Sequence, residues 1–207
     1  LKRDEDGEKI QSLIIKVGRI QFLLLGAVVV GFACIGKSFI NIWLGKRYED
    51  VYIISLILMV PSLFELCVNV CLAILRAKNK LVFRTCILCI STLLNASVTI
   101  LAVKYWSYIG AAIGTALSFI LGSVFVMNLF YYKELHLPMI KIYIEIMRGI
   151  LPCLIASGTL LFAVSRYITG GWLELVINII VFCIVYGILL MLFGLSTEEK
   201  RELKLCK

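Results

Sequence analysis

The sequence is poor in the residues that carry acid–base and metal chemistry. It has one histidine, His136, and three aspartates, Asp4, Asp6 and Asp50, and all four lie outside the long apolar runs. A membrane enzyme such as a glycan polymerase or an acyltransferase needs convergent acidic, histidine or arginine side chains. An enzyme is therefore kept only as the least favoured alternative, and no catalytic residue is predicted.

Charged residues of any kind are also scarce, at 16% of the chain, whereas 61% of the residues are hydrophobic. A soluble domain is about half apolar. The apolar runs recur along the chain, and each is long enough to cross about 30 Å of hydrocarbon as a helix. Because backbone groups in lipid must be satisfied within their own segment, helices are favoured over strands. We predict an all-α integral membrane protein, a bundle of six transmembrane helices over 20–42, 51–75, 84–103, 110–130, 149–166 and 172–192.

Cysteine is plentiful, but its placement does not indicate a metal or redox centre. Seven of the eight cysteines lie in apolar runs, where they behave as small apolar residues. Cys86 and Cys89 form a C-x-x-C pair without a second pair or a nearby histidine, so zinc binding is not favoured. We expect no metal and no cofactor.

The distribution of lysine and arginine predicts the orientation of the chain. Sixteen of the 21 lie in 1–19, 76–84, 131–148 and 193–207, and five lie in the segments on the other side. Positive charge accumulates on the cytoplasmic side, so both termini are expected in the cytoplasm. Topology also accounts for the net charge of +8, and a nucleic-acid partner is not expected.

The same pattern divides the chain into five parts. The segments 1–19 and 131–148 have amphipathic stretches that predict helices at the headgroup boundary. The first 19 residues do not resemble a signal peptide, and the chain, which begins with Leu1, is expected to be the later part of a longer polypeptide. The predicted parts are a cytoplasmic lead-in 1–19, a four-helix part 20–130, an interfacial segment 131–148, two C-terminal transmembrane helices 149–192 and a cytoplasmic tail 193–207.

Small residues recur every fourth position in the predicted fourth helix. Gly110, Gly114, Ser118 and Gly122 lie on one helical face. Such a small-xxx-small pattern lets two helix backbones approach closely. We expect this face to pack against a neighbouring helix.

The predicted second helix carries a proline, a carboxylate and an amide on one face. Pro61, Glu65 and Asn69 are spaced four residues apart, and Pro61 is expected to act as a hinge. A charge at a helix centre costs roughly 2.5–3.5 kcal/mol on insertion. Glu65 is therefore either a substrate-cavity or proton-coupling carboxylate, or a protonated side chain that hydrogen-bonds a neighbouring helix.

Two further polar features are candidates for contact with a substrate. Thr92, Asn95 and Thr99 share a face of the predicted third helix, which we expect to partner Glu65, either as structural contacts or as part of a cavity. Lys37 lies about two turns inside the external end of the first helix, where its side chain either reaches outward to water or attracts an anionic substrate.

Three segments, FINIWLGKRY at 39–48, AILRAKNKL at 73–81 and IGAAIGTALS at 109–118, occur in this order at helix ends. Over about residues 10–195 the chain resembles the C-terminal half of a polysaccharide biosynthesis flippase, an O-antigen and capsule repeat-unit exporter of the multidrug/oligosaccharidyl-lipid/polysaccharide exporter superfamily. The resemblance implies 12–14 helices in two lobes around a central cavity. Where that family has a Tyr-Gly pair, this chain has Trp106 and Ser107.

The resemblance implies that the protein moves an undecaprenyl-pyrophosphate-linked oligosaccharide across the bacterial plasma (inner) membrane for surface polysaccharide synthesis, by alternating access. Glu65, Asn69, Thr92 and Asn95 would line the cavity, and Lys37 would meet the pyrophosphate. The implied partners are membrane lipids, the lipid-linked substrate, a missing N-terminal lobe of the same polypeptide and polysaccharide polymerase machinery. The alternatives are an ion-coupled drug or metabolite exporter of the same superfamily, with Glu65 as the coupling carboxylate, and a structural subunit that requires a partner.

Overall fold

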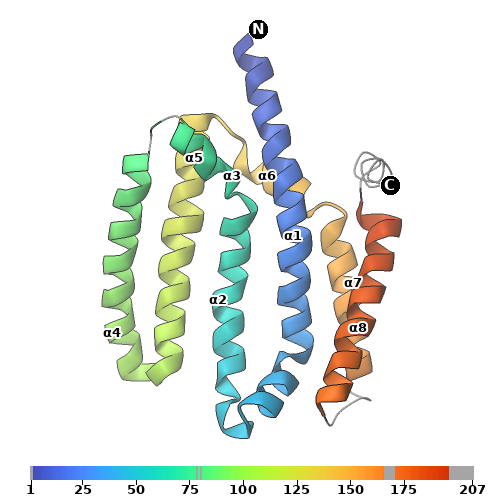
Figure 1. Cartoon of the computed structure of the whole chain (residues 1–207). Helices are drawn as coiled ribbons and strands as arrows, with labels where there is room; N and C mark the ends of the chain where they lie inside the picture. The colour runs from blue at the N-terminus through green and yellow to red at the C-terminus, as the bar shows by residue number, and fades with distance from the viewer. Residues whose placement is uncertain (1, 78, 80, 166–170, 196–207) are drawn as a thin grey trace. The chain divides into compact units, whose positions relative to one another are not determined.

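The structure, a computed structural model, describes residues 2–77, 79, 81–165 and 171–195, and all of its regular elements are helices (Figure 1). Two π-helical segments and a 3₁₀ turn are included among them. The elements are α1 (Lys2–Trp43), a 3₁₀ turn (Lys46–Tyr48), α2 (Asp50–Cys67), α3 (Val70–Ala77), α4 (Leu81–Phe119), a π segment (Ile120–Val126), α5 (Met127–Leu135), α6 (Met139–Met147), α7 (Ile150–Ser165), α8 (Trp172–Leu189) and a second π segment (Leu190–Gly194).

Five helical stretches of the described residues are long and apolar enough to cross a membrane. They are Gly7–Trp43, Asp50–Cys67, Leu81–Tyr105, Ser107–Leu135 and Trp172–Gly194, and α6 with α7 makes a sixth if that broken pair is one span. Large apolar side chains are exposed along these stretches, as expected for helices whose outer faces contact lipid tails rather than water. The prediction of an all-helical membrane protein is confirmed.

The chain forms two compact units, and α1 contributes to both. The first unit comprises Leu1–Gln21 and Ile53–Ile146. Here Arg19 of α1 donates a hydrogen bond to the carbonyl of Glu145 in α6, 3.0 Å away. A Cβ added at Gly18 would lie 2.6 Å from the Cys67 carbonyl oxygen, so a glycine at this position lets the backbones of α1 and α2 come close.

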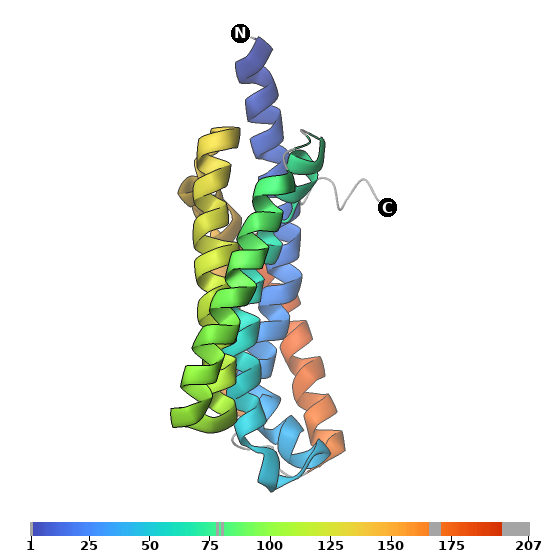
Figure 2. The same ribbon diagram turned by 90° about the vertical axis from the view of Figure 1, so that its left-hand side faces the viewer.

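The α4 helix of the first unit reverses direction and returns alongside itself (Figures 1 and 2). The reversal centres on Ser107, whose φ of 51° places it in the left-handed region. Residues adopt this left-handed conformation singly, and one such residue interrupts the helix where the chain reverses. We call Leu81–Tyr105 and Ser107–Phe119 the two arms of the α4 hairpin; the side chain of Trp106 lies outside the described residues.

The second unit comprises Phe22–Tyr52 and Met147–Lys207, which hold the second half of α1 together with α7 and α8. The hydroxyl of Tyr186 in α8 donates to the carbonyl of Leu23 in α1, 3.1 Å away. The Cys34 thiol of α1 donates to the carbonyl of Gly158 in α7 at 3.3 Å. These bonds connect α1 to α8 at Leu23 and to α7 at Cys34.

The predicted helix 51–75 is not one helix. It ends at Cys67, and α3 begins at Val70. The break does not occur at Pro61, which α2 accommodates inside an unbroken helix. Instead, the amides of Val68 and Asn69 bond to the carbonyls three residues earlier, which tightens the last turn as helix ends commonly do.

The two stretches that we predicted as amphipathic helices also differ from one another. The lead-in 1–19 continues into the first apolar span as one helix, Lys2–Trp43, because its helical periodicity runs on without a proline. The stretch at 139–147 is a separate helix, since Gly149 adopts a φ of 83° before α7 begins, a conformation that glycine adopts without a steric cost. The described part of the predicted tail 193–207 is limited to residues 193–195.

Candidate functional site

Glu65 lies two residues before the end of α2, and its partner is a cation rather than an amide. Its Oε1 is 3.6 Å from Nη2 of Arg84, in the first turn of α4, and both side chains are about three-quarters buried. We predicted that Thr92, Asn95 and Thr99 would partner Glu65. That prediction is wrong, because the partner is Arg84, which lies eight residues before Thr92, about two helical turns closer to the start of α4, and brings an opposite charge.

A carbonyl in the last turn of α2 accepts a hydrogen bond from a side chain that the sequence did not indicate. The tightened turn at Val68 leaves the carbonyl of Phe64 without its helical donor, and carbonyls at helix ends need an external partner. The hydroxyl of Tyr143 in α6 donates to this carbonyl at 3.1 Å, and the Asn128 amide of α5 donates to the Tyr143 hydroxyl at 3.2 Å. Tyr143 thus connects three elements beside the Glu65–Arg84 pair.

Asn69 does not share a helical face with Glu65. It lies in the break between α2 and α3, its side chain is exposed, and its carbonyl accepts from the amide of Leu72 at 3.0 Å. The expected face of Pro61, Glu65 and Asn69 required one continuous helix. Because the helix ends at Cys67, the structure brings Glu65 together with Arg84 and leaves Asn69 on the turn.

Asn95 and Thr99 belong to the α4 hairpin. The Asn95 Oδ1 accepts hydrogen bonds from Thr99 at 2.9 Å, on the same arm, and from Thr115 at 3.3 Å, on the other arm. Thr92 instead donates to the carbonyl of Leu88, at 2.8 Å, a common local bond for threonine in helices. The polar face of this helix therefore joins the two arms of the hairpin.

The predicted face of small residues, on the second arm and the π segment that follows it, packs against the first arm. A Cβ added at Gly114 would lie 2.9 Å from the Thr99 hydroxyl, and those added at Gly110 and Gly122 would collide with Ala102 and Ser91. Ser118 is buried, and its hydroxyl donates to the carbonyl of Gly114 at 2.9 Å. The close approach of the arms therefore depends on the absence of side chains at these positions.

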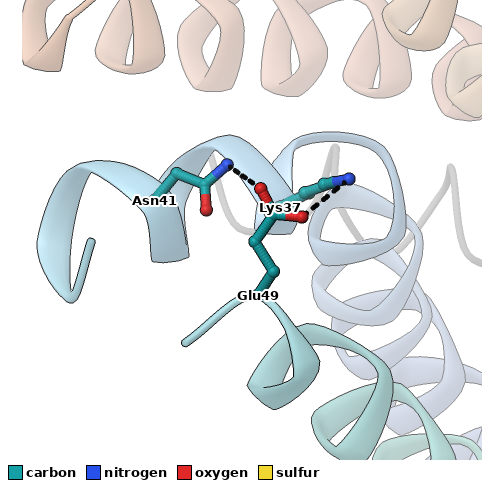
Figure 3. A network of polar contacts seen from close by, with 3 residues as sticks. All are labelled: Lys37, Asn41 and Glu49. Carbon is teal, nitrogen blue, oxygen red and sulfur yellow. Dashed lines mark hydrogen bonds and ion pairs between the residues drawn. The ribbon is translucent and has the colours of Figure 1, made fainter. Parts of the chain in front are cut away.

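Lys37 is held in a polar network at the end of α1 (Figure 3). Its ammonium lies 3.1 Å from Oε2 of Glu49, and the amide nitrogen of Asn41 donates to Oε1 of the same carboxylate at 3.2 Å. The hydrogen bonds from Lys37 and Asn41 hold the pKa of Glu49 below its ordinary value. Lys37 is therefore already partnered by an anion, and its side chain is exposed.

Among the described residues, no three histidine, cysteine, aspartate or glutamate side chains lie close enough to hold a metal ion. Cys86 and Cys89 are both exposed on the first arm of α4. The polar groups that the structure brings together are ion pairs and hydrogen-bonded amides.

No family model, no curated protein and no solved structure matches this chain.

Proposed function

We propose that the chain is part of an exporter that moves a lipid-linked oligosaccharide across the bacterial plasma membrane by alternating access. The substrate class comes from the resemblance of FINIWLGKRY, AILRAKNKL and IGAAIGTALS to polysaccharide flippases. In this proposal the remaining helices of the transporter are supplied by an N-terminal lobe, and polysaccharide polymerase machinery acts on the exported product.

The observation that best supports transport is the interrupted helix α2–α3 with an ion pair at the interruption. Charged side chains within membrane-spanning helices are costly to insert and commonly mark the path of a substrate or ion. Interrupted helices often form substrate sites in transporters, because their ends expose unpaired backbone groups. Here Glu65 and Arg84 lie beside the end of α2, 3.6 Å apart.

The arrangement suggests how a pyrophosphate could be bound and released. Arginine presents a planar set of donors that matches phosphate oxygens, and Arg84 would bind the pyrophosphate on the side where the charge distribution places the cytoplasm. Glu65 keeps the guanidinium paired when the substrate is absent. The pyrophosphate displaces Glu65 on entry, and the return of Glu65 assists release.

A second pair offers the same exchange on the opposite side of the membrane. Lys37 is paired with Glu49 at the end of α1 that the charge distribution places outside. A pyrophosphate leaving the transporter would compete with Glu49 for the lysine. Because Lys37 is more exposed than Arg84, this contact is screened by water and should contribute less.

Complementation of a bacterium that lacks its own polysaccharide flippase tests the proposal. The full-length gene should restore surface glycan, measured by lectin or antibody binding. Arg84→Gln should reduce the rate of restoration at least about tenfold, the factor that corresponds to about 1.4 kcal/mol, and Arg84→Lys should retain part of it. The exposed arginine of α3, Arg76, supplies the matched control, Arg76→Gln.

The outcome separates the two transport hypotheses. Equal restoration by Arg84→Gln and the wild type would remove the assigned role of Arg84. If no gene variant restores glycan, but the wild type exports a drug and Glu65→Gln does not, the ion-coupled exporter replaces the flippase, with Glu65 as its coupling carboxylate. Membrane expression of each variant is measured alongside, so that loss of the protein is not mistaken for loss of transport.

A further inference from the structure

The second unit contains a polar cavity that none of the features above explains. It has a volume of about 510 Å³, and its lining combines apolar side chains of α1 and α8 with polar ones. The polar lining includes Asn41 and Lys46 from the end of α1 and its following turn, and Glu174 and Asn178 from the first two turns of α8. Glu174 and Asn178 are four residues apart and so lie on one helical face.

Three buried oxygens in this lining lack a hydrogen-bond partner. Among the described residues, four buried side-chain oxygens have none, and three of them are Oδ1 of Asn41, Oε2 of Glu174 and Oδ1 of Asn178. Asn178 is only 4% exposed. Buried polar groups are nearly always paired with protein or water, so three unpaired acceptor oxygens around one cavity suit it to a molecule that donates hydrogen bonds.

All three unpaired atoms are acceptors, which restricts the chemistry of that ligand. The orientation of the Asn41 amide is fixed, because its nitrogen donates to Glu49 and a flipped amide would place oxygen against a carboxylate (Figure 3). Its oxygen therefore remains an acceptor. The ligand must donate hydrogen bonds, and an ammonium group offers three N–H donors, as many as there are unpaired oxygens. The Glu174 carboxylate supplies an opposite charge.

The cavity lies at the level where lipid headgroups are found. Exposed tryptophans stand at the ends of both helices, Trp43 at the last residue of α1 and Trp172 at the first of α8. Tryptophan prefers the membrane–water interface. Phe39 and Trp172 are in contact, with ring centroids 6.4 Å apart, so these two helix ends are neighbours. Asn178 follows Trp172 by six residues, about 9 Å along the helix, just below the interface.

We propose that this cavity binds the headgroup of a phospholipid that carries a primary ammonium, phosphatidylethanolamine. The ammonium donates to Glu174, Asn178 and Asn41, and Lys46 lies in the lining to meet the phosphate. The two charged residues in the described part of the lining thus match the two charges of the zwitterionic headgroup. This site does not depend on which substrate the protein transports.

A comparison of two lipids tests the site without any substitution. The purified full-length protein is transferred to detergent with either phosphatidylethanolamine or phosphatidylcholine of identical acyl chains. Lipid retention is measured by native mass spectrometry, and the thermal midpoint is measured in parallel. Phosphatidylethanolamine should be retained at least about tenfold more tightly, because the quaternary ammonium of choline has no N–H donor. Equal retention of the two lipids would overturn the proposal.

Two variants and a matched control locate the binding to this cavity. Asn178→Leu and Glu174→Gln should each abolish most of the preference for phosphatidylethanolamine. Gln21→Leu removes the fourth unpaired buried oxygen, which belongs to the other unit, and should leave the preference unchanged. An unchanged preference in both cavity variants would overturn the proposal, as would saturation of the site by free ethanolamine with no contribution from the lipid.

Discussion

Two asparagines in apolar helices, Asn95 in the α4 hairpin and Asn178 in α8, have opposite environments. The Oδ1 of Asn95 accepts hydrogen bonds from Thr99 and Thr115. The Oδ1 of Asn178 is buried and accepts none from the described residues. In the hairpin the polar groups satisfy one another across close-packed glycines, whereas in the second unit they surround a cavity.

The difference shows how to distinguish structural polar groups from ligand-binding ones in a membrane protein. Polar side chains in lipid are stabilising when they find partners and costly when they do not. A hairpin with satisfied groups should be sensitive to any added volume. A cavity with unsatisfied groups should tolerate added volume and lose function instead. Each of the following predictions tests one side of this comparison.

The largest effect is expected from added volume in the hairpin. Gly110→Val places a side chain against the backbone of Ala102, which cannot move without separating the arms, and should lower the free energy of unfolding by about 3 kcal/mol. Denaturation in mixed detergent micelles measures this. Gly187→Val is the control, since no atom lies within 4 Å of the added Cβ there. Equal losses in the two variants would contradict the close packing.

The two asparagines should respond to the same substitution in opposite directions. Asn95→Leu removes the acceptor shared by Thr99 and Thr115 and should cost about 1 kcal/mol. Asn178→Leu removes an unpaired buried acceptor and should raise the free energy of unfolding by about 1 kcal/mol in lipid-free detergent. The same unfolding experiment compares them. Destabilisation by both substitutions would mean that Asn178 already has a partner.

A smaller gain is expected at the reversal of the hairpin. Ser107 has a φ of 51°, a conformation that costs an L-residue roughly 1 kcal/mol and glycine almost nothing. Ser107→Gly should therefore stabilise the protein by up to about 1 kcal/mol. The matched variant Ser97→Gly, within the first arm, should destabilise it, because glycine is unfavourable in a helix interior. Stabilisation by both would show that the effect is not specific to the turn.

The smallest effect is expected at the exposed network of the second unit. The pKa of Glu49 is lowered by Lys37 and Asn41, so the folded state favours the ionised carboxylate. This contribution to stability is present above the ordinary pKa of about 4.5 and is lost as the pH falls through the lowered value. The difference in thermal midpoint between the wild type and Glu49→Gln should therefore be small at pH 6 and shrink as the pH falls below about 4.5. A difference in thermal midpoint that grows as the pH falls would contradict a lowered pKa of Glu49 in the folded state.

The sequence was sufficient to predict those features of the fold that depend on the residue pattern within one segment. The apolar runs predicted the helical membrane protein, and the spacing of Gly110, Gly114, Ser118 and Gly122 indicated a close-packed helix face. The gap between the predicted helices 84–103 and 110–130 also contains the reversal at Ser107. These features depend on periodicity along one segment, which a single sequence contains.

Features that depend on contacts between distant segments were not predictable. Nothing in the pattern around Glu65 indicated that Arg84 would reach it, or that Tyr143, 79 residues from Phe64, would complete the end of α2. The break at residues 68–69 contains neither glycine nor proline, the residues that usually indicate the end of a helix in a sequence. Asn178 is a single amide in an apolar run, and such a residue gives no sign in the sequence of whether its hydrogen-bond partner is present.

Direct measurement of lipid-linked oligosaccharide movement tests the central claim. The full-length protein is reconstituted into vesicles that carry a fluorescent undecaprenyl-pyrophosphate oligosaccharide, and the fraction of the glycan that a non-penetrating hydrolase can reach is followed with time. The proposal predicts that the protein makes the inner-leaflet pool accessible, with Arg84→Gln at least about tenfold slower and Arg76→Gln unaffected. Accessibility that rises no faster than in protein-free vesicles, with folded protein present, would contradict it.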